Sequence, residues 1–151
     1  MQIETFDALS AMLRDLGLDC EEPAPGLLEL TIAGVPVCLR WDDRLPLVHI
    51  VVPIYAGAAA EVVEVLCRFN HELPLPGLGW DPASSHIYFR AVLARGREGV
   101  TFTALDGLLT LVLDCVRSVR PALDELFLPA MPAPAAEAHQ ALVDIGDYMA
   151  A

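Results

Sequence analysis

The sequence predicts an α+β fold in which helices pack on a mainly antiparallel sheet. Amphipathic stretches with helical spacing alternate with groups of short strand-like runs, in which apolar and polar residues alternate. These runs are joined by short turns and do not show a strict β-α-β alternation, which is typical of helices laid on an antiparallel layer. The predicted order is α-β-β-β-α-β-β-α, plus an extra C-terminal helix.

The first predicted element is an amphipathic helix over residues 5–16, where apolar residues recur at helical spacing and a glycine follows. After a possible short strand over 18–22, a cluster of proline and glycine forces a turn. Two alternating runs, 27–32 and 35–41, then flank an Ala-Gly dipeptide. Two such runs around a two-residue turn predict a β-hairpin.

The middle of the chain predicts the centre of the sheet. Residues 47–54 form a nearly continuous apolar run with β-branched side chains, as expected of a central strand covered on both faces. An amphipathic helix is predicted over 58–73, and Pro74 ends it. Two further runs, 78–81 and 86–94, predict a second hairpin.

The last third of the chain predicts a long helix and an extension. Thr103 begins a capping-box pattern, and apolar residues follow at helical spacing. Pro121 either kinks this helix or restarts it at a first-turn position. We therefore divide the chain into a domain at 1–128, a stiff Pro/Ala linker at 129–134 and a helical extension at 135–151.

Composition excludes several functional classes. Nine basic and 21 acidic residues give a net charge of −12, which repels phosphate, so we expect no direct nucleic-acid binding. Every basic residue is an arginine, so a Schiff-base lysine and a lysine-containing phosphate loop are impossible. With glycine counted and tyrosine left out, apolar residues make up about 60% of the chain, against a usual ~45–50%. This excess indicates a further buried surface, such as a dimer interface or a partner groove.

The N-terminal sequence, the length of the uncharged stretches and the cysteine spacing indicate a cytoplasmic protein without membrane association. The N-terminus lacks the basic and apolar regions of a signal peptide. The longest uncharged stretch, 45–60, contains two prolines and is too short to span a bilayer. The cysteines lie far apart, and we expect them to be reduced, buried thiols: Cys20, Cys38, Cys67 and Cys115.

No catalytic, metal or cofactor site is predicted. His71 and Glu72 begin a zinc-protease motif, but its second histidine is missing and Pro74 would break the helix that presents the ligands. Adjacent carboxylates at Asp42 and Asp43 are typical of a turn. The alternative is a small-molecule-binding or hydrolytic domain whose site forms only in three dimensions, near these residues: His49, His71 and Asp81.

Aromatic residues beside arginines offer a second alternative, a nucleic-acid platform. The residues concerned lie in two predicted strands, and packing on strand faces with snorkelling arginines is the favoured interpretation, because the negative charge repels phosphate. They are Trp41, Tyr88, Phe89, Arg40 and Arg90.

Three local sequences, in their order and spacing, resemble the YbjN family, a bacterial group with the fold of type III secretion chaperones. They are Gly34-Val35-Pro36-Val37, Leu66-Cys67-Arg68-Phe69-Asn70-His71-Glu72-Leu73 and Gly99-Val100-Thr101. The likeness covers about residues 5–127, and the linker and final helix depart from the pattern. The resemblance implies a type III secretion chaperone-like fold and a homodimeric, non-enzymatic, chaperone-like or regulatory protein that binds other proteins. It carries no catalytic residues.

The resulting hypothesis is an adaptor that binds a partner protein. Because an acidic body attracts basic proteins and speeds their association, we expect a basic partner, such as a nucleic-acid-binding protein. Two apolar stripes are candidates for the dimer or partner interface, although the first can instead face its own sheet and the second can be a loosely docked terminal helix. They are Val62, Val65, Leu66 and Phe69 in the second helix, and Leu142, Ile145 and Met149 in the extension.

Overall fold

The computed structural model describes residues 1–127 and contains three helices and eight strands in that part of the chain. The predicted fold class and the predicted order of the long elements are confirmed. The helices are α1 (Phe6–Asp15), α2 (Val62–Glu72) and α3 (Phe102–Phe127). The strands are β1 (Gln2–Ile3), β2 (Cys20–Ala24), β3 (Leu27–Ile32), β4 (Val35–Asp42), β5 (Leu47–Tyr55), β6 (Leu78–Asp81), β7 (His86–Ala94) and β8 (Val100–Thr101).

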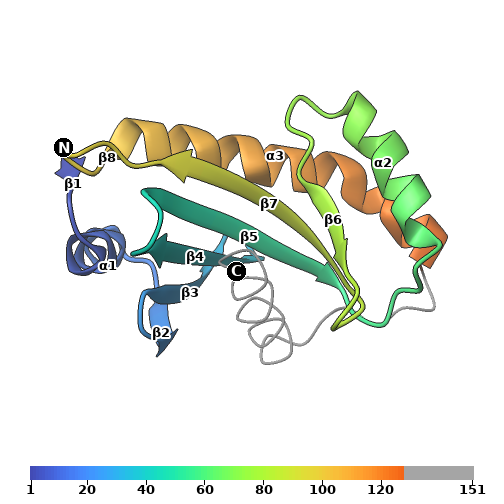
Figure 1. The fold of residues 1–151 in the computed structure, drawn as a ribbon, viewed down its shortest axis with the longest axis horizontal. Helices are drawn as coiled ribbons and strands as arrows, with labels where there is room; N and C mark the ends of the chain where they lie inside the picture. The colour runs from blue at the N-terminus through green and yellow to red at the C-terminus, as the bar shows by residue number, and fades with distance from the viewer. Residues whose placement is uncertain (128–151) are drawn as a thin grey trace.

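Six of the strands form one antiparallel sheet in the order β2-β3-β4-β5-β7-β6. β5 lies inside this sheet, and every residue from Val48 to Tyr55 is buried, so the prediction of a central strand is confirmed. β1 and β8 pair separately and join the N-terminus to the start of α3. Figure 1 shows α3 running along the sheet, with α1 towards one end and α2 towards the other.

The first hairpin has the turn that its Ala-Gly dipeptide predicts. Ala33 and Gly34 both have positive φ angles, 50° and 80°, and they connect the paired residues Ile32 and Val35. Two consecutive residues of positive φ form the turn whose twist matches that of the flanking strands. This turn fixes the register of β3 against β4, and so fixes which side chains share a face.

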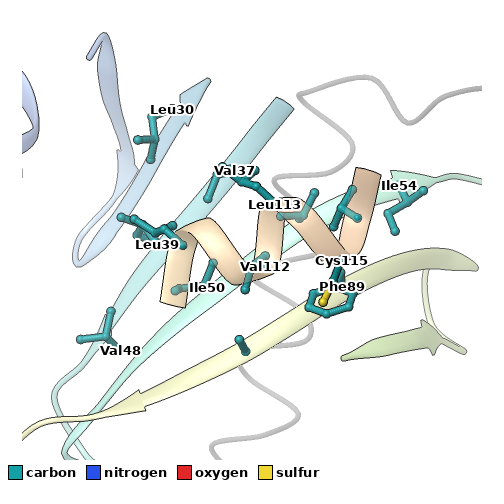
Figure 2. Packing of buried hydrophobic residues seen from close by; sticks show 14 of the residues in the cluster. Leu30, Val37, Leu39, Val48, Ile50, Ile54, Phe89, Val112, Leu113 and Cys115 are labelled. Atoms are coloured by element: carbon teal, nitrogen blue, oxygen red, sulfur yellow. The ribbon is translucent and has the colours of Figure 1, made fainter. Parts of the chain in front are cut away.

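The core lies between one face of the sheet and the three helices. Alternate residues of the strands point towards α3, as Figure 2 shows. Phe89, Ile50 and Val112 are each fully buried there. The residues labelled in this view come from four strands and one helix: Leu30, Val37, Leu39, Val48, Ile50, Ile54, Phe89, Val112, Leu113 and Cys115.

Two predicted helix starts are wrong. α2 begins at Val62, not at residue 58, because the amide of Ala58 donates to the carbonyl of Ser85, 2.9 Å away, and ties this segment to the second hairpin. α3 begins at Phe102, and its cap is Thr101, whose hydroxyl accepts from the amide of Ala104 at 3.1 Å. The predicted capping box at Thr103 therefore lies inside the helix.

Two prolines lie inside regular elements, Pro121 in α3 and Pro23 in β2. α3 continues through Pro121 to Phe127, so the helix is one element and does not restart there. The possible strand over 18–22 exists as β2 and includes Pro23, which an edge strand tolerates because one side of it makes no ladder bonds. The predicted linker at 129–134 and the helix at 135–151 lie outside the described residues.

Three of the four cysteines lie in the interior of the protein. Cys20, Cys38 and Cys115 are buried, as predicted, whereas Cys67 is exposed on the outer side of α2, so the prediction for that residue is wrong. All four thiols are free. None of the helices in residues 1–127 is long and apolar enough to cross a membrane.

Two glycines test how the N-terminal segment is held. A Cβ on Gly99, whose φ is +87°, would lie 1.9 Å from the carbonyl oxygen of Ile3, whereas a Cβ on Gly107 in α3 would meet nothing within 4 Å. We predict that Gly99→Ala lowers the free energy of unfolding by about 2–3 kcal/mol. We predict that Gly107→Ala raises it by about 0.5–1 kcal/mol, because alanine favours a helix over glycine. Urea unfolding measures both, and equal effects would contradict this packing.

Candidate partner-binding surfaces

One face of the six-stranded sheet is covered by none of the described helices, and we call it the open face. Every buried apolar residue of α1, α2 and α3 belongs to the core cluster on the other face. The open face has its own small apolar cluster, and all its members come from strands. They are Leu27, Cys38 and Val51, each 5% exposed, with Ala24 and Tyr88 packed against them.

Charge is ordered across the open face. The strand register places Glu21, Glu29, Cys38, Val51 and Arg90 in one row, each opposite the next on the neighbouring strand. The row is acidic at the β2 edge, apolar in the middle and basic on β7. Opposite partners on neighbouring strands share a face, so this row is a continuous surface feature.

The acidic end of the open face is hollowed, and we call this hollow the acidic groove. Its volume is about 350 Å³. Carboxylates of Asp19, Glu21 and Glu29 line one side, and Cys38 and Pro53 are among the apolar residues that line the rest. Burial, with a smaller contribution from the Glu29 carboxylate, raises the pKa of the Cys38 thiol to about 12, so this thiol stays protonated and unreactive.

The part of the open face next to the β4–β5 turn holds a buried polar pair. His49 Nε2 lies 3.3 Å from the carboxylate of Asp42, and these side chains are 11% and 6% exposed. The other oxygen of Asp42 accepts from the amides of Arg44 and Leu45, at 2.9 and 3.1 Å. The turn role predicted for Asp42 is therefore confirmed, and the carboxylate holds the β4–β5 connection closed.

Arg95 holds the same turn from the end of β7. Its guanidinium donates to the carbonyl of Asp42 and, at 3.3 Å, to that of Leu45. The guanidinium also lies 4.4 Å from the centre of the Trp41 ring, a cation–π geometry. The Asp42–His49 pair is thus part of a structural junction between three strands.

The three residues of the hydrolytic alternative are not brought together. His71 is exposed on α2, whereas His49 lies in the middle of the sheet. Asp81 caps the β6–β7 turn, where its carboxylate accepts from the amides of Ala83 and Ser84. No group of three metal-ligating side chains occurs within residues 1–127.

The aromatic residues of the platform alternative are divided between the two faces. Trp41 and Phe89 belong to the core cluster, whereas Tyr88 packs on the open face. Arg40 and Arg90 pair with open-face positions on β5, His49 and Val51. A platform needs its aromatic rings on one surface, so strand-face packing explains these residues.

A second, apolar groove lies where the start of α2 meets the end of α3. It has a volume of about 490 Å³, and Val62, Val65, Leu126 and Phe127 line it. Of the predicted interface residues, Val62 and Leu66 are 4% and 2% exposed and belong to the core. Val65 and Phe69 are half-buried, and we call the surface formed by the apolar groove and Phe69 the α2 surface. Leu142, Ile145 and Met149 lie outside the described residues.

The acidic groove was not among the predicted sites. Its carboxylates come from the segment before β2, from β2 and from β3, and only the strand register brings them together. Apolar and polar residues alternate over 27–32, and this alternation places Glu29 on the polar face of its strand. That placement was the sequence signal that could have indicated the acidic groove.

Comparisons with known proteins agree with this fold. The model of a family named YbjN, described as "Putative bacterial sensory transduction regulator", matches residues 5–125. A crystal structure of YbjN from E. coli, described as a "putative transcription regulator", is 15% identical, with a TM-score of 0.64 over 87% of this chain and 98% of that one. A chain of the HopA1–SchA chaperone–effector complex is 14% identical, with a TM-score of 0.54 over 80% of this chain and 91% of that one. No curated protein sequence matches.

The His49–Asp42 junction predicts how stability depends on pH. Burial, reinforced by Arg90 and Arg40, lowers the pKa of His49 below 6.5 despite the opposing effect of Asp42. The unfolded chain therefore takes up a proton first, and stability is full above pH 6.5 and falls as pH drops towards the lowered pKa. We predict that His49→Gln flattens this loss in urea unfolding between pH 7.5 and 5.5. The control His71→Gln, at an exposed histidine, should keep the wild-type slope, and an unchanged slope in His49→Gln would contradict the assignment.

Proposed function

The chain belongs to the YbjN family, and from that premise we propose that it is a non-enzymatic adaptor that binds a basic segment of a partner protein in the acidic groove. The observation that carries this proposal is the combination of three carboxylates and an apolar lining in one hollow of the open face. Its fold, shared with a chain of a chaperone–effector complex, supports protein binding as the activity.

Electrostatics favours a basic occupant. Glu21 and Glu29 lie directly opposite each other on β2 and β3, and like charges in that position reduce sheet stability. Both carboxylates would attract an arginine or lysine side chain of a bound segment. The net charge of −12 adds a long-range attraction that raises association rates for basic proteins and weakens at high salt.

The groove suits a segment with both charged and apolar side chains. Cys38 and Pro53 provide an apolar floor beside the carboxylates. A basic amphipathic segment would bury its apolar side chains on this floor and direct its cations to Asp19, Glu21 and Glu29. A nucleic-acid-binding protein is one class of partner with such segments.

The proposal includes a homodimer formed through the α2 surface. Val65 and Phe69 are half-buried, and Leu126, which lines the same groove as Val65, is 53% exposed. Clustered apolar exposure of this kind is typical of an interaction surface. A second copy is the occupant we propose, because the same surface on two subunits can form a two-fold interface.

The compartment and the absence of catalysis are also part of the proposal. Four free thiols support a reducing compartment, for which we propose the cytoplasm. The separation of His49, His71 and Asp81 removes the geometric support for the hydrolytic alternative.

The acidic groove predicts a charge-dependent capture of basic proteins. We predict that full-length protein captures basic proteins from lysate at low salt, and that Asp19→Asn with Glu21→Gln and Glu29→Gln reduces their yield about tenfold, by loss of complementary charge. The control changes as much charge elsewhere: Glu4→Gln with Asp15→Asn and Glu125→Gln. Quantitative mass spectrometry compares the three baits, and equal yields from both variants would refute the groove as the binding site.

The proposed dimer makes a separate prediction. Val65→Asp and Phe69→Asp should each raise the dimer dissociation constant at least about tenfold, because each places a charge in an apolar interface. Leu111→Asp, at a residue of α3 that is 36% exposed and outside the α2 surface, serves as the control and should leave it unchanged. Sedimentation velocity measures the mass, with circular dichroism as a check of folding. A monomeric wild type at high concentration would disprove the dimer.

A further inference from the structure

Two arginines on the open face come from the strands on either side of β5, and we call them the arginine pair. The strand register places Arg40 of β4 opposite His49 and Arg90 of β7 opposite Val51. Because His49 and Val51 are two residues apart on β5, all four side chains share one face. Burial lowers the pKa of His49, and the guanidinium groups of Arg90 and Arg40 lower it further, as expected of cations near its ring. This part of the open face is therefore positive, although the chain as a whole is strongly negative.

The carboxylate of Asp42 on the same strand as Arg40 is already engaged. It accepts from the amides of Arg44 and Leu45, and it lies 3.3 Å from His49 Nε2. Its side chain is only 6% exposed, whereas both members of the arginine pair are half-buried and present part of their side chains at the surface. An anionic group that binds at this surface would therefore meet the two guanidinium groups, and charge-assisted hydrogen bonds of this kind are strong.

A short apolar strip separates the arginine pair from the acidic groove. Glu29 lines the groove from β3, and β5 lies two strands further along the sheet. Neighbouring strands are about 4.8 Å apart, so a group above β5 lies roughly 10 Å from Glu29. Cys38, opposite Glu29 on β4, lies between them, and Leu27 belongs to the same apolar cluster. In one direction across the strands, the open face thus offers carboxylates, then an apolar strip and then guanidinium groups.

We propose that the partner segment bound in the acidic groove carries both charges in a fixed order, with cations at one end, apolar side chains in the middle and a carboxylate that binds between Arg40 and Arg90. This inference rests on the proposed function and deepens it, because it states the charge pattern of the partner segment. The pattern also fixes the orientation of the segment. A reversed segment would bring its cations to the arginine pair and its carboxylate to the acidic groove, and both contacts are repulsive.

An amphipathic helix can present this pattern on one face. Residues i, i+4 and i+7 of a helix lie on the same side, and the rise from i to i+7 is about 10.5 Å. An arginine at i, a leucine at i+4 and a glutamate at i+7 would therefore all point to the open face together. Their spacing matches the distance of roughly 10 Å from Glu29 to the space above β5.

Three fluorescently labelled helical peptides test the proposal against the full-length protein. The ordered peptide has arginine at i, leucine at i+4 and glutamate at i+7. The glutamine peptide has glutamine in place of that glutamate, and the displaced peptide has the glutamate at i+9, on the opposite side of the helix, with the same composition as the ordered peptide. We expect fluorescence anisotropy to show that the ordered peptide binds about fivefold more tightly than either of the others, or better.

Variants of the protein identify the groups responsible for this preference. Arg40→Gln with Arg90→Gln should abolish the preference for the ordered peptide without weakening the binding of the glutamine peptide. The control, Arg14→Gln with Arg117→Gln, removes the same charge from exposed positions of α1 and α3 and should keep the preference. Circular dichroism checks that each variant is folded.

Several results would overturn the proposal. They are equal affinities of the ordered and glutamine peptides for the wild type, equal affinities of the ordered and displaced peptides, and a preference that survives in Arg40→Gln with Arg90→Gln. The proposed function is tested separately by Asp19→Asn with Glu21→Gln and Glu29→Gln, which should weaken all three peptides. If that variant binds the peptides as the wild type does, the acidic groove is not the binding site. If it weakens them while the ordered and glutamine peptides bind the wild type equally, only the charge pattern proposed here is refuted.

Discussion

The alternation of side chains along β5 divides the whole molecule. Val48, Ile50 and Val52 point to the helices, while His49 and Val51 point to the open face, and all five residues are buried. Because the pleat repeats every two residues, a slip of one residue would move the core set to the other face. The Ala33–Gly34 turn and the Asp42 turn on either side of β4 hold that register. The core and the proposed binding surface are therefore consequences of the same constraint.

That division explains why function is assigned to surfaces and not to a catalytic centre. The polar groups buried on the open face serve the strands: Asp42 holds a turn, and His49 is held by Asp42. What remains for recognition is an ordered row of charge, from Glu21 and Glu29 at one edge to Arg90 near the other. A surface of this kind distinguishes partners by charge and register, which suits the proposed adaptor role.

Much of the fold could be predicted from the sequence, because its long elements carry strong periodicity. The continuous run at 47–54 and the Ala-Gly turn were sufficient for the central strand and the first hairpin. β1 and β8 have two residues each, too few for any periodicity, and their pairing depends on Gly99 lying against Ile3. The start of α2 depends on a hydrogen bond to Ser85, which is distant in sequence. The acidic groove was missed for the same reason, since register assembles it.

The most direct test of the account compares the two faces within single strands. Methyl NMR signals of Leu27 and Val51 report the open face. Those of Leu28, which follows Leu27, and of Ile50, which precedes Val51, report the core. Titration with the basic partner recovered by capture should shift the signals of Leu27 and Val51 and leave those of Leu28 and Ile50 in place. Equal shifts at all four residues, or shifts confined to the α2 surface, would contradict the assignment of the open face as the binding surface.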